Sequence, residues 1–372
     1  MHKNLSFLLL AGLFIGQIGQ SLAQDWFKPA WPNTDFSRHV IDFSEILSGG
    51  VPKDGIPAID RPSFESVDQA SQWMSPDEPV IVLRVSTKAR AYPLQILTWH
   101  EIVNDSLEDV PVAVTYCPLC NAAIVFNRRV NGQVLDFGTT GLLRNSDLVM
   151  YDRQSESWWQ QFSGRGIVGQ YTGTLLATLP AQVVAFREFA DAFPEGTVLS
   201  KNTGMSRAYG RNPYTGYDRI GERPFLFRGK LDERLPAMER VLNVSIEGQH
   251  KIYPLSELES RPVVNDNVAG LPVLVLAASR MRSALDRASI ADSRFIPAAV
   301  AYARQAGERL LSFETDGGEV VDRETGSRWN VFGEAVSGPL KGQQLEALGG
   351  GAHFAFAWLA FFPQSEIFRA GK

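Results

Sequence analysis

The segment IVLRVSTKARAYPLQILTWHEIVNDSLEDVPVAVTYCP, residues 81–118, occurs in a second version later in the chain. That version, RVLNVSIEGQHKIYPLSELESRPVVNDNVAGLPVLVLAAS, covers residues 240–279. Both contain Tyr-Pro-Leu, then Val-Asn-Asp, then Pro-Val, and the spacing between these motifs is the same. Matches in one order at a constant spacing are typical of an internal duplication. We therefore expect one folding module to occur twice.

A second pair of segments extends the repeat toward the end of each module. YDRQSESWWQQFSGRGIVG, from Tyr151, is similar to VDRETGSRWNVFGEAVSG, from Val321, and the two share an Asp-Arg pair, a Trp and a Phe in the same order. The chain is therefore predicted to divide into a signal peptide, 1–23; an N-terminal wrapping segment, 24–80; a first module, 81–200; an ordered linker, 201–239; and a second module, 240–372.

Each module is predicted to be an α+β unit of mainly antiparallel β-structure with short helices. Both begin with a strand of period-two alternation (VLRVS, VLNVS) and continue through a charged turn and a short helical stretch to an apolar strand. In the first module Asn131-Gly132 lies between β-branched segments, and this pair favours a tight hairpin turn. A helix is expected at about 183–193.

The first residues, MHKNLSFLLLAGLFIGQIGQSLAQ, are typical of a secretory signal peptide with cleavage near Ala23. The predicted location is therefore periplasmic or secreted. The apolar run is too short for a comfortable membrane span, and no later segment is long and apolar enough. A formal net charge of −5 makes nucleic acid an unfavourable partner, and the sequence does not define an oligomeric state.

The chain has only two cysteines, Cys117 and Cys120, and they lie together in VTYCPLC. In the duplicated template they correspond to Ala278 and Met281, so the shared fold does not require sulfur. The thiols are an addition to the first module. Three explanations are open.

One explanation is a structural disulfide, since exported proteins meet oxidants. Closing so small a loop stabilises a fold by only about 2 kcal/mol. Another is a thiol-disulfide oxidoreductase, because a Cys-x-x-Cys pair can exchange disulfides. The segment after Cys120 is predicted to be a strand, so no helix dipole would stabilise a thiolate there.

The third explanation is a metal ion, because two thiolates on one turn can hold a soft ion. The predicted ligands are Cys117, Cys120, His100 and Met150. This set favours copper over zinc or calcium, because closed zinc sites use four sulfur or imidazole ligands and the chain has no second cysteine pair. Metal handling and copper-dependent redox chemistry are both open; if the protein is an enzyme, the sequence predicts a metal- or thiol-dependent oxidoreductase.

Weaker candidates for binding a polar small molecule lie around these positions. Glu101 and Asp147 are acidic residues without a counterpart in the second module, whereas Asp105 and Asp152 recur there and are predicted to be turn and salt-bridge residues. A non-catalytic binding module is the remaining alternative. Its candidate contacts are Arg144, Asn145, Trp158, Trp159, Arg211 and Tyr214.

Five stretches together resemble the hallmarks of the domain of unknown function family 3179, which is found in bacteria and archaea. They are GGVPKDGIPAIDRP, YPLQILTWHEIVND, VTYCPLCNAAIVF, GLLRNSDLVMYDRQSESWWQQFSG and RNPYTGYD. The resemblance covers most of the predicted mature chain. It implies that His100, Cys117, Cys120, the turn at 144–147 and Met150 fall within recurrent motifs, and it implies no reaction or cofactor.

Overall fold

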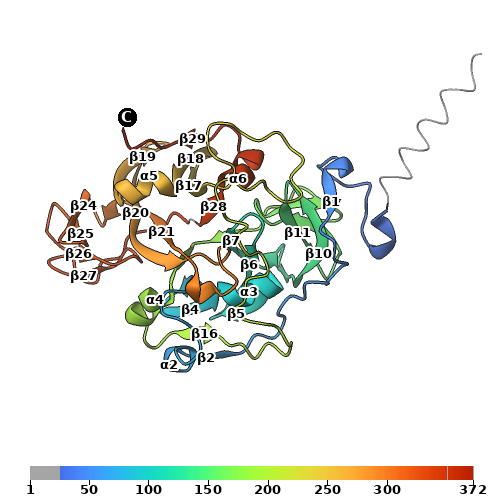
Figure 1. Ribbon diagram of the computed structural model, residues 1–372, viewed down its shortest axis with the longest axis horizontal. Coiled ribbons are helices and arrows are strands. Elements are labelled where there is room, and N and C mark those ends of the chain that lie inside the picture. Colours follow the sequence, from blue (N-terminus) through green and yellow to red (C-terminus); the bar gives the residue numbers. More distant parts are fainter. Residues whose placement is uncertain (1–25, 350, 372) are drawn as a thin grey trace, which may run out of the picture.

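A computed structural model describes residues 26–349 and 351–371 of the chain. The predicted signal peptide, 1–23, lies outside the described residues. The fold is mainly β, with several antiparallel sheets and a few short helices (Figure 1). Within the described ranges, no helix has the length and apolar character needed to cross a bilayer.

The helices are short, and most of them follow directly on a strand. The α-helices are α2 (Val67–Ala70), α3 (Leu94–His100), α4 (Phe186–Ala192), α5 (Leu255–Ser260) and α6 (Ala355–Phe361). The 3₁₀ helices are η1 (Lys28–Ala30), η2 (Phe43–Glu45) and η3 (Ile290–Asp292). The helix expected at 183–193 begins later than predicted, because its first residues complete an edge strand, β15.

Three sheets are built mainly from residues before 200. One has the order β15-β3-β4-β16-β2, formed by Ala181–Ala185, Pro79–Val85, Lys88–Pro93, Thr197–Leu199 and Phe64–Ser66. The next is β14-β7-β6-β5, formed by Thr178–Leu179, Ala122–Asn127, Val110–Cys117 and Ile102–Leu107. The third is β1-β10-β11-β12-β13, formed by Ile46–Ser48, Phe137–Arg144, Asp147–Asp152, Trp158–Gln160 and Arg165–Val168.

Three further sheets are built from residues after 239. They are β28-β17-β18-β29 (Ala352–Phe354, Arg240–Ile246, Gln249–Pro254, Glu366–Ile367), β19-β20-β21 (Val263–Val268, Leu271–Arg282, Phe295–Ala303) and β24-β25-β26-β27 (Phe313–Asp316, Glu319–Asp322, Arg328–Trp329, Ala335–Ser337). Two small hairpins are β8-β9 (Arg129–Val130, Gln133–Val134) and β22-β23 (Gln305–Ala306, Arg309–Leu310).

The β8–β9 hairpin confirms the turn predicted from Asn131-Gly132. Both residues have positive φ, 49° and 83°, as a two-residue primed turn requires. The strands predicted for VLRVS, VLNVS and the two later apolar runs are confirmed as β3, β17, β6 and β20. Local alternation therefore located these strands correctly.

The largest hydrophobic cluster contains residues from both parts of the chain. Phe126 and Cys117 belong to it together with Leu274, Tyr302 and Phe354. The sheet containing β10 and β11 lies toward one end of the molecule and the β24–β27 sheet toward the other (Figure 1). The sheet that carries the cysteines lies between them and is covered from several directions.

Candidate metal centre

The two cysteines lie on either side of the tight connection between β6 and β7. Cys117 is the last residue of β6 and pairs with Ala122, the first residue of β7. Asn121 adopts a positive φ of 51°, which reverses the chain within the turn. Both thiols are free and buried, with exposed fractions of 1% for Cys117 and 0% for Cys120.

A second turn, between β10 and β11, meets the thiols from the other side. Arg144 pairs with Asp147, and the two residues between them, Asn145 and Ser146, both have positive φ, 53° and 66°. This left-handed pair makes a two-residue hairpin. It directs the carbonyl oxygen of Ser146 toward the thiols, at 3.4 Å from the sulfur of Cys120.

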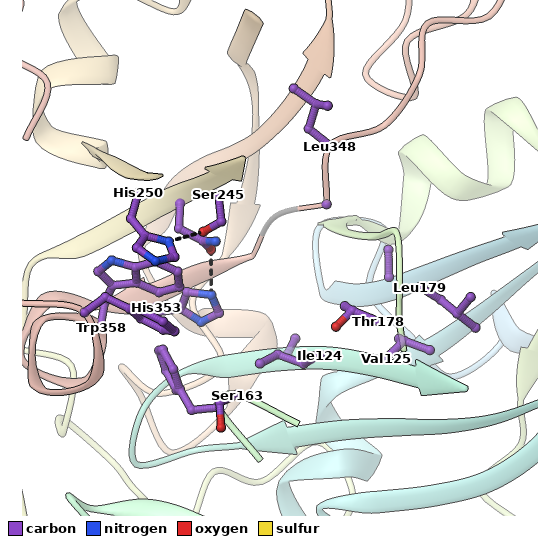
Figure 2. A pocket seen from close by; sticks show the side chains of 16 residues that line it. Ile124, Val125, Ser163, Thr178, Leu179, Ser245, His250, Leu348, His353 and Trp358 are labelled. Atoms are coloured by element: carbon purple, nitrogen blue, oxygen red, sulfur yellow. Dashed lines mark hydrogen bonds between the residues drawn. The ribbon is translucent and has the colours of Figure 1, made fainter. Parts of the chain in front are cut away.

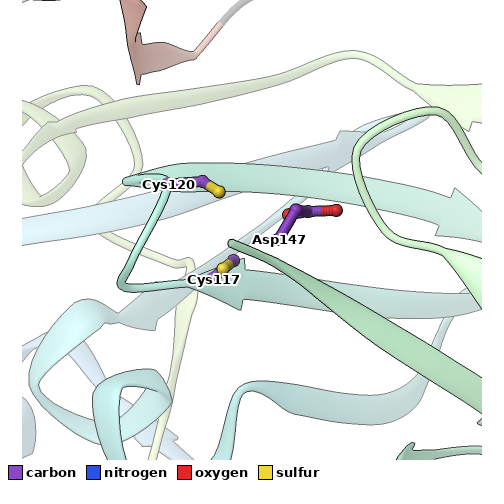
Figure 3. Close-up of side chains that lie close together, drawn as sticks. All are labelled: Cys117, Cys120 and Asp147. Carbon is purple, nitrogen blue, oxygen red and sulfur yellow. The ribbon is translucent and has the colours of Figure 1, made fainter. Parts of the chain in front are cut away.

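The hairpin also places the Asp147 carboxylate beside the sulfurs, so that Cys117, Cys120 and Asp147 form one group (Figure 3). Their ligand atoms all lie within 4.8 Å of one another, and all three residues are buried. Within the described ranges, no other group of three or more His, Cys, Asp or Glu side chains has its ligand atoms at such short distances. The Cys117–Cys120–Asp147 group can hold a metal ion.

Asp147 has an incomplete set of hydrogen bonds. One oxygen, Oδ2, accepts bonds from the Gln160 side chain at 2.6 Å and from the Phe162 amide at 3.0 Å. The other oxygen, Oδ1, is buried and has no hydrogen-bond partner. Burying a carboxylate oxygen without a partner destabilises the folded state, because the oxygen loses its hydration. A bound proton or cation relieves this penalty.

Burial shifts the acid–base equilibria of the group toward the neutral forms. It raises the pKa of Asp147 to about 7, against the lowering effect of its hydrogen bonds to Gln160 and Phe162 and, to a smaller extent, of the nearby thiols of Cys120 and Cys117. Burial raises the pKa of the Cys117 thiol and, to a greater extent, that of Cys120. Without a counter-charge the two sulfurs therefore remain thiols near neutral pH.

Glu101 is a second buried carboxylic acid, and it interacts electrostatically with Asp147 and Cys117. It follows α3 with a positive φ of 59°, and its carbonyl accepts the Tyr116 amide, which fixes it against β6. Burial, and secondarily the charge of Asp147, raise the pKa of its carboxyl group to about 8. Glu101 and Asp147, weak candidates from the sequence, both influence the Cys117 thiol electrostatically.

His100, the predicted third ligand, is not part of the Cys117–Cys120–Asp147 group. Its Nδ1 donates to the carbonyl of Pro57 at 2.7 Å, and its Nε2 accepts from the Tyr209 hydroxyl at 2.6 Å. Both ring nitrogens are therefore engaged elsewhere. Glu101, which has a positive φ, ends α3 directly after His100, and β5 begins at the next residue.

Met150 and the two tryptophans are core residues in this structure. Met150 is fully buried on β11, paired with Thr139 on β10 and Trp159 on β12. Trp159 donates its indole N–H to Asp152 at 2.9 Å, and Trp158 packs among aromatic residues of the N-terminal segment. Because both indoles are 0% exposed, they do not present a surface to a polar ligand.

The remaining binding candidates occupy different environments. Arg144 forms an ion pair with Glu45 at 2.7 Å, and Arg211 is exposed, with its carbonyl accepting the Trp99 indole N–H. Asn145, with its positive φ, is one of the two turn residues between β10 and β11. Tyr214 is half-buried beside the centre, where burial first, and then the charges of Glu101 and Cys117, raise the pKa of its hydroxyl.

The linker covers the thiol turn. The Tyr217 hydroxyl donates to the carbonyl of Leu119 at 3.0 Å and accepts from the Phe225 amide at 3.2 Å. The Ser146 hydroxyl donates to the carbonyl of Phe225 at 2.5 Å. The sequence pattern did not predict the role of Phe225, because a contact between a linker and a turn leaves no periodic pattern.

The recurrent aspartates have structural partners, as predicted. Asp105 accepts from the Tyr92 hydroxyl at 2.7 Å and forms an ion pair with Arg90 at 2.6 Å. Asp152 accepts from Ser155 and from the Trp159 indole. These contacts satisfy both carboxylates, in contrast to Asp147.

Comparison with known proteins identifies a family and no characterised relative. No curated protein matches the chain, and no solved structure matches it. The family model described as "Protein of unknown function (DUF3179)" matches residues 53–365, which include the thiol turn and the β10–β11 hairpin. The chain belongs to this DUF3179 family.

Proposed function

We propose that this protein is an exported metal-handling protein that binds one copper(I) ion at Cys117, Cys120 and Asp147. The observation that carries the proposal is the meeting of two buried sulfurs with a buried carboxylate oxygen that has no hydrogen-bond partner. A cation supplies the missing counter-charge, and a coordinated thiol loses its proton.

The donor set favours a thiophilic ion. Thiolate ligands select Cu(I), zinc and iron–sulfur clusters, whereas magnesium and calcium prefer sites made entirely of oxygen. A structural zinc site is usually closed by four ligands, and this group supplies three. Copper(I) accepts low coordination numbers, so two thiolates and the Asp147 carboxylate are enough to hold it.

Burial favours holding an ion over turning over a substrate. The sulfurs are at most 1% exposed, and the linker residues Tyr217 and Phe225 are hydrogen-bonded over the turn. An ion can reach the thiols only after this cover opens. Slow exchange of a tightly held ion fits metal handling better than an oxidase reaction.

The test is metal binding by reduced protein under anaerobic conditions. Copper(I) is offered in competition with a chromophoric Cu(I) chelator, and bound copper and zinc are measured by elemental analysis. We expect about one copper per chain in the wild type and none in the Cys117→Ser/Cys120→Ser double variant. Equal copper content in the two proteins would refute the proposal.

Asp147→Asn and Asp105→Asn form a matched pair in this assay. The Asp147 variant is expected to bind copper at least tenfold more weakly, because it changes the third group of the centre. Asp105→Asn removes a carboxylate of the same module that already has its partners, Tyr92 and Arg90. Its copper affinity is expected to stay within about twofold of the wild type.

A thiol-disulfide oxidoreductase is the second candidate, because the carboxyl group of Asp147, whose pKa is raised, lies beside the thiols and can accept a proton from one of them. Two observations favour the metal. First, the chain continues after Cys120 into strand β7, so no helix N-terminus is present to stabilise a thiolate. Second, both sulfurs are buried. A reduction potential near that of known disulfide exchangers, together with no copper bound, would reverse the choice.

We also infer that the two modules arose by duplication. Asn104 exchanges two hydrogen bonds with the backbone of Phe137, and Asn265 exchanges the same two with Phe313. The Trp329 indole donates to Asp322 at 2.9 Å, as Trp159 does to Asp152. These shared contacts support a common origin. Superposition of an experimental structure of one module on the other is the test.

A further inference from the structure

A cavity of about 320 Å³ lies between the sheet that carries the cysteines and the second module (Figure 2). Ile124 and Leu179 line it from the first module, and His250, His353 and Trp358 line it from the second. The residues at its edge include exposed Thr178 and half-buried His250, so the cavity is open to solvent. It is separate from the Cys117–Cys120–Asp147 group.

The walls of the cavity are aromatic and uncharged. His353 stacks on Trp358 with an interplanar angle of 12°, and Phe162 packs against both rings. No Asp, Glu, Lys or Arg is among the described residues that line the cavity. Such a site suits a neutral ligand with an aromatic ring, because an ionic ligand would be desolvated without a partner.

His353 provides a specific polar contact. Its Nε2 is bonded to the side-chain oxygen of Asn243 at 2.9 Å, so Nε2 carries the proton and Nδ1 is an acceptor. The side chain is 3% exposed, and Nδ1 has no hydrogen-bond partner. Among the residues that line the cavity, it is the one buried side-chain polar atom without a partner in the described structure. A ligand with an O–H or N–H group can supply the missing donor.

We propose that this cavity binds a neutral aromatic molecule carrying a hydroxyl or N–H donor, with the ring against Trp358 and Phe162 and the donor bonded to Nδ1 of His353. Pockets of this size that combine apolar walls with few polar groups are typical of small-molecule sites. The proposed ligand contacts none of Cys117, Cys120 and Asp147, so the proposal does not rest on metal binding; the two places are connected through Phe162, whose amide donates to Asp147.

The test compares two probes, 4-fluorophenol and 4-fluoroanisole, by ¹⁹F NMR titration of the wild-type protein; in the anisole a methyl group replaces the hydroxyl proton, so the donor is lost. The phenol is expected to bind about tenfold more tightly, the effect of one hydrogen bond to a buried acceptor. In His353→Phe the two affinities should become equal. Leu179→Trp, which fills the cavity from its edge, should weaken both probes.

The wild-type comparison alone decides the proposal, so a poorly folded His353 variant would not leave it open. Equal affinities of the two probes for the wild type, or no binding of either at millimolar concentration, would overturn it. Unchanged binding to Leu179→Trp would place the probes elsewhere and would also overturn it.

Discussion

The main-chain amide of Phe354 donates a hydrogen bond of 2.9 Å to the carbonyl of Cys120. Next to it, the side chain of Asn121 donates to the carbonyl of Ala352 at 2.6 Å and accepts from the Tyr116 hydroxyl at 3.1 Å. The cysteine-free second module therefore holds the thiol turn of the first.

Replacing Asn121 by Gly tests this contact between the modules. Glycine accepts the positive φ of 51°, so the substitution removes the side-chain hydrogen bonds without straining the backbone. We expect the free energy of unfolding to fall by about 1–2 kcal/mol in urea titrations. The two thiols should also react faster with a maleimide in the native state.

Asn131→Gly is the matched control for that variant. Asn131 has nearly the same φ, 49°, but lies exposed in the β8–β9 hairpin. Its replacement should change stability by less than about 0.5 kcal/mol. Equal effects of the two substitutions would show that the Asn121 side chain contributes nothing to the contact.

The stability of the metal-free, reduced protein should depend on Asp147 through pH. The pKa of this group is raised from 3.8 to about 7 in the folded state, so the folded protein retains a proton that the unfolded chain has lost. Its contribution to stability is complete below pH 3.8 and is lost as the pH rises toward 7. We expect wild-type stability to fall over this window by an amount on the order of a few kcal/mol.

Asp147→Asn has no proton to lose at this position, so its stability should fall less between pH 4 and pH 7. The measurement is a series of urea denaturations at fixed ionic strength for both proteins. The slope contributed by Glu101, whose pKa of about 8 is also raised, should persist in the variant. Identical slopes in the two proteins would mean that Asp147 is ionised in the folded state.

Gly141→Ala should disturb the strand that leads into the Ser146 hairpin. Gly141 has a positive φ of 73°, and an added Cβ would lie 2.1 Å from the carbonyl oxygen of Val51. We expect a loss of about 2–4 kcal/mol in unfolding free energy, because neither backbone segment can move aside easily. Gly221→Ala is the control, since nothing lies within 4 Å of its added Cβ. A Gly141 variant as stable as this control would contradict the packing described here.

His100→Asn separates structural from ligand roles at the end of α3. The variant can keep a donor for the Pro57 carbonyl but loses the acceptor that binds Tyr209. We expect lower stability, by about 1–3 kcal/mol, with copper stoichiometry unchanged. Elemental analysis of the folded variant is the measurement, and loss of copper would restore His100 as a ligand.

Several features of the fold could be predicted because they depend on neighbouring residues. Alternating apolar residues marked β3 and β17, and Asn131-Gly132 marked a hairpin, since strand periodicity and turn chemistry are local properties. The same reasoning failed at the start of α4. There, pairing of β15 with β3 overrides the helical pattern at Val183 and Val184.

From the sequence alone one can see that both cysteines lie in one short stretch, and that the residues aligned with them in 240–279, Ala278 and Met281, carry no thiol. The third member of the group, Asp147, becomes visible only in the folded chain. His100 is closer in sequence to Cys117, yet Asp147 reaches the sulfurs because the left-handed turn of Asn145 and Ser146 directs it there. The physical reason is that strand register and turn geometry depend on packing between distant segments, which no local pattern records.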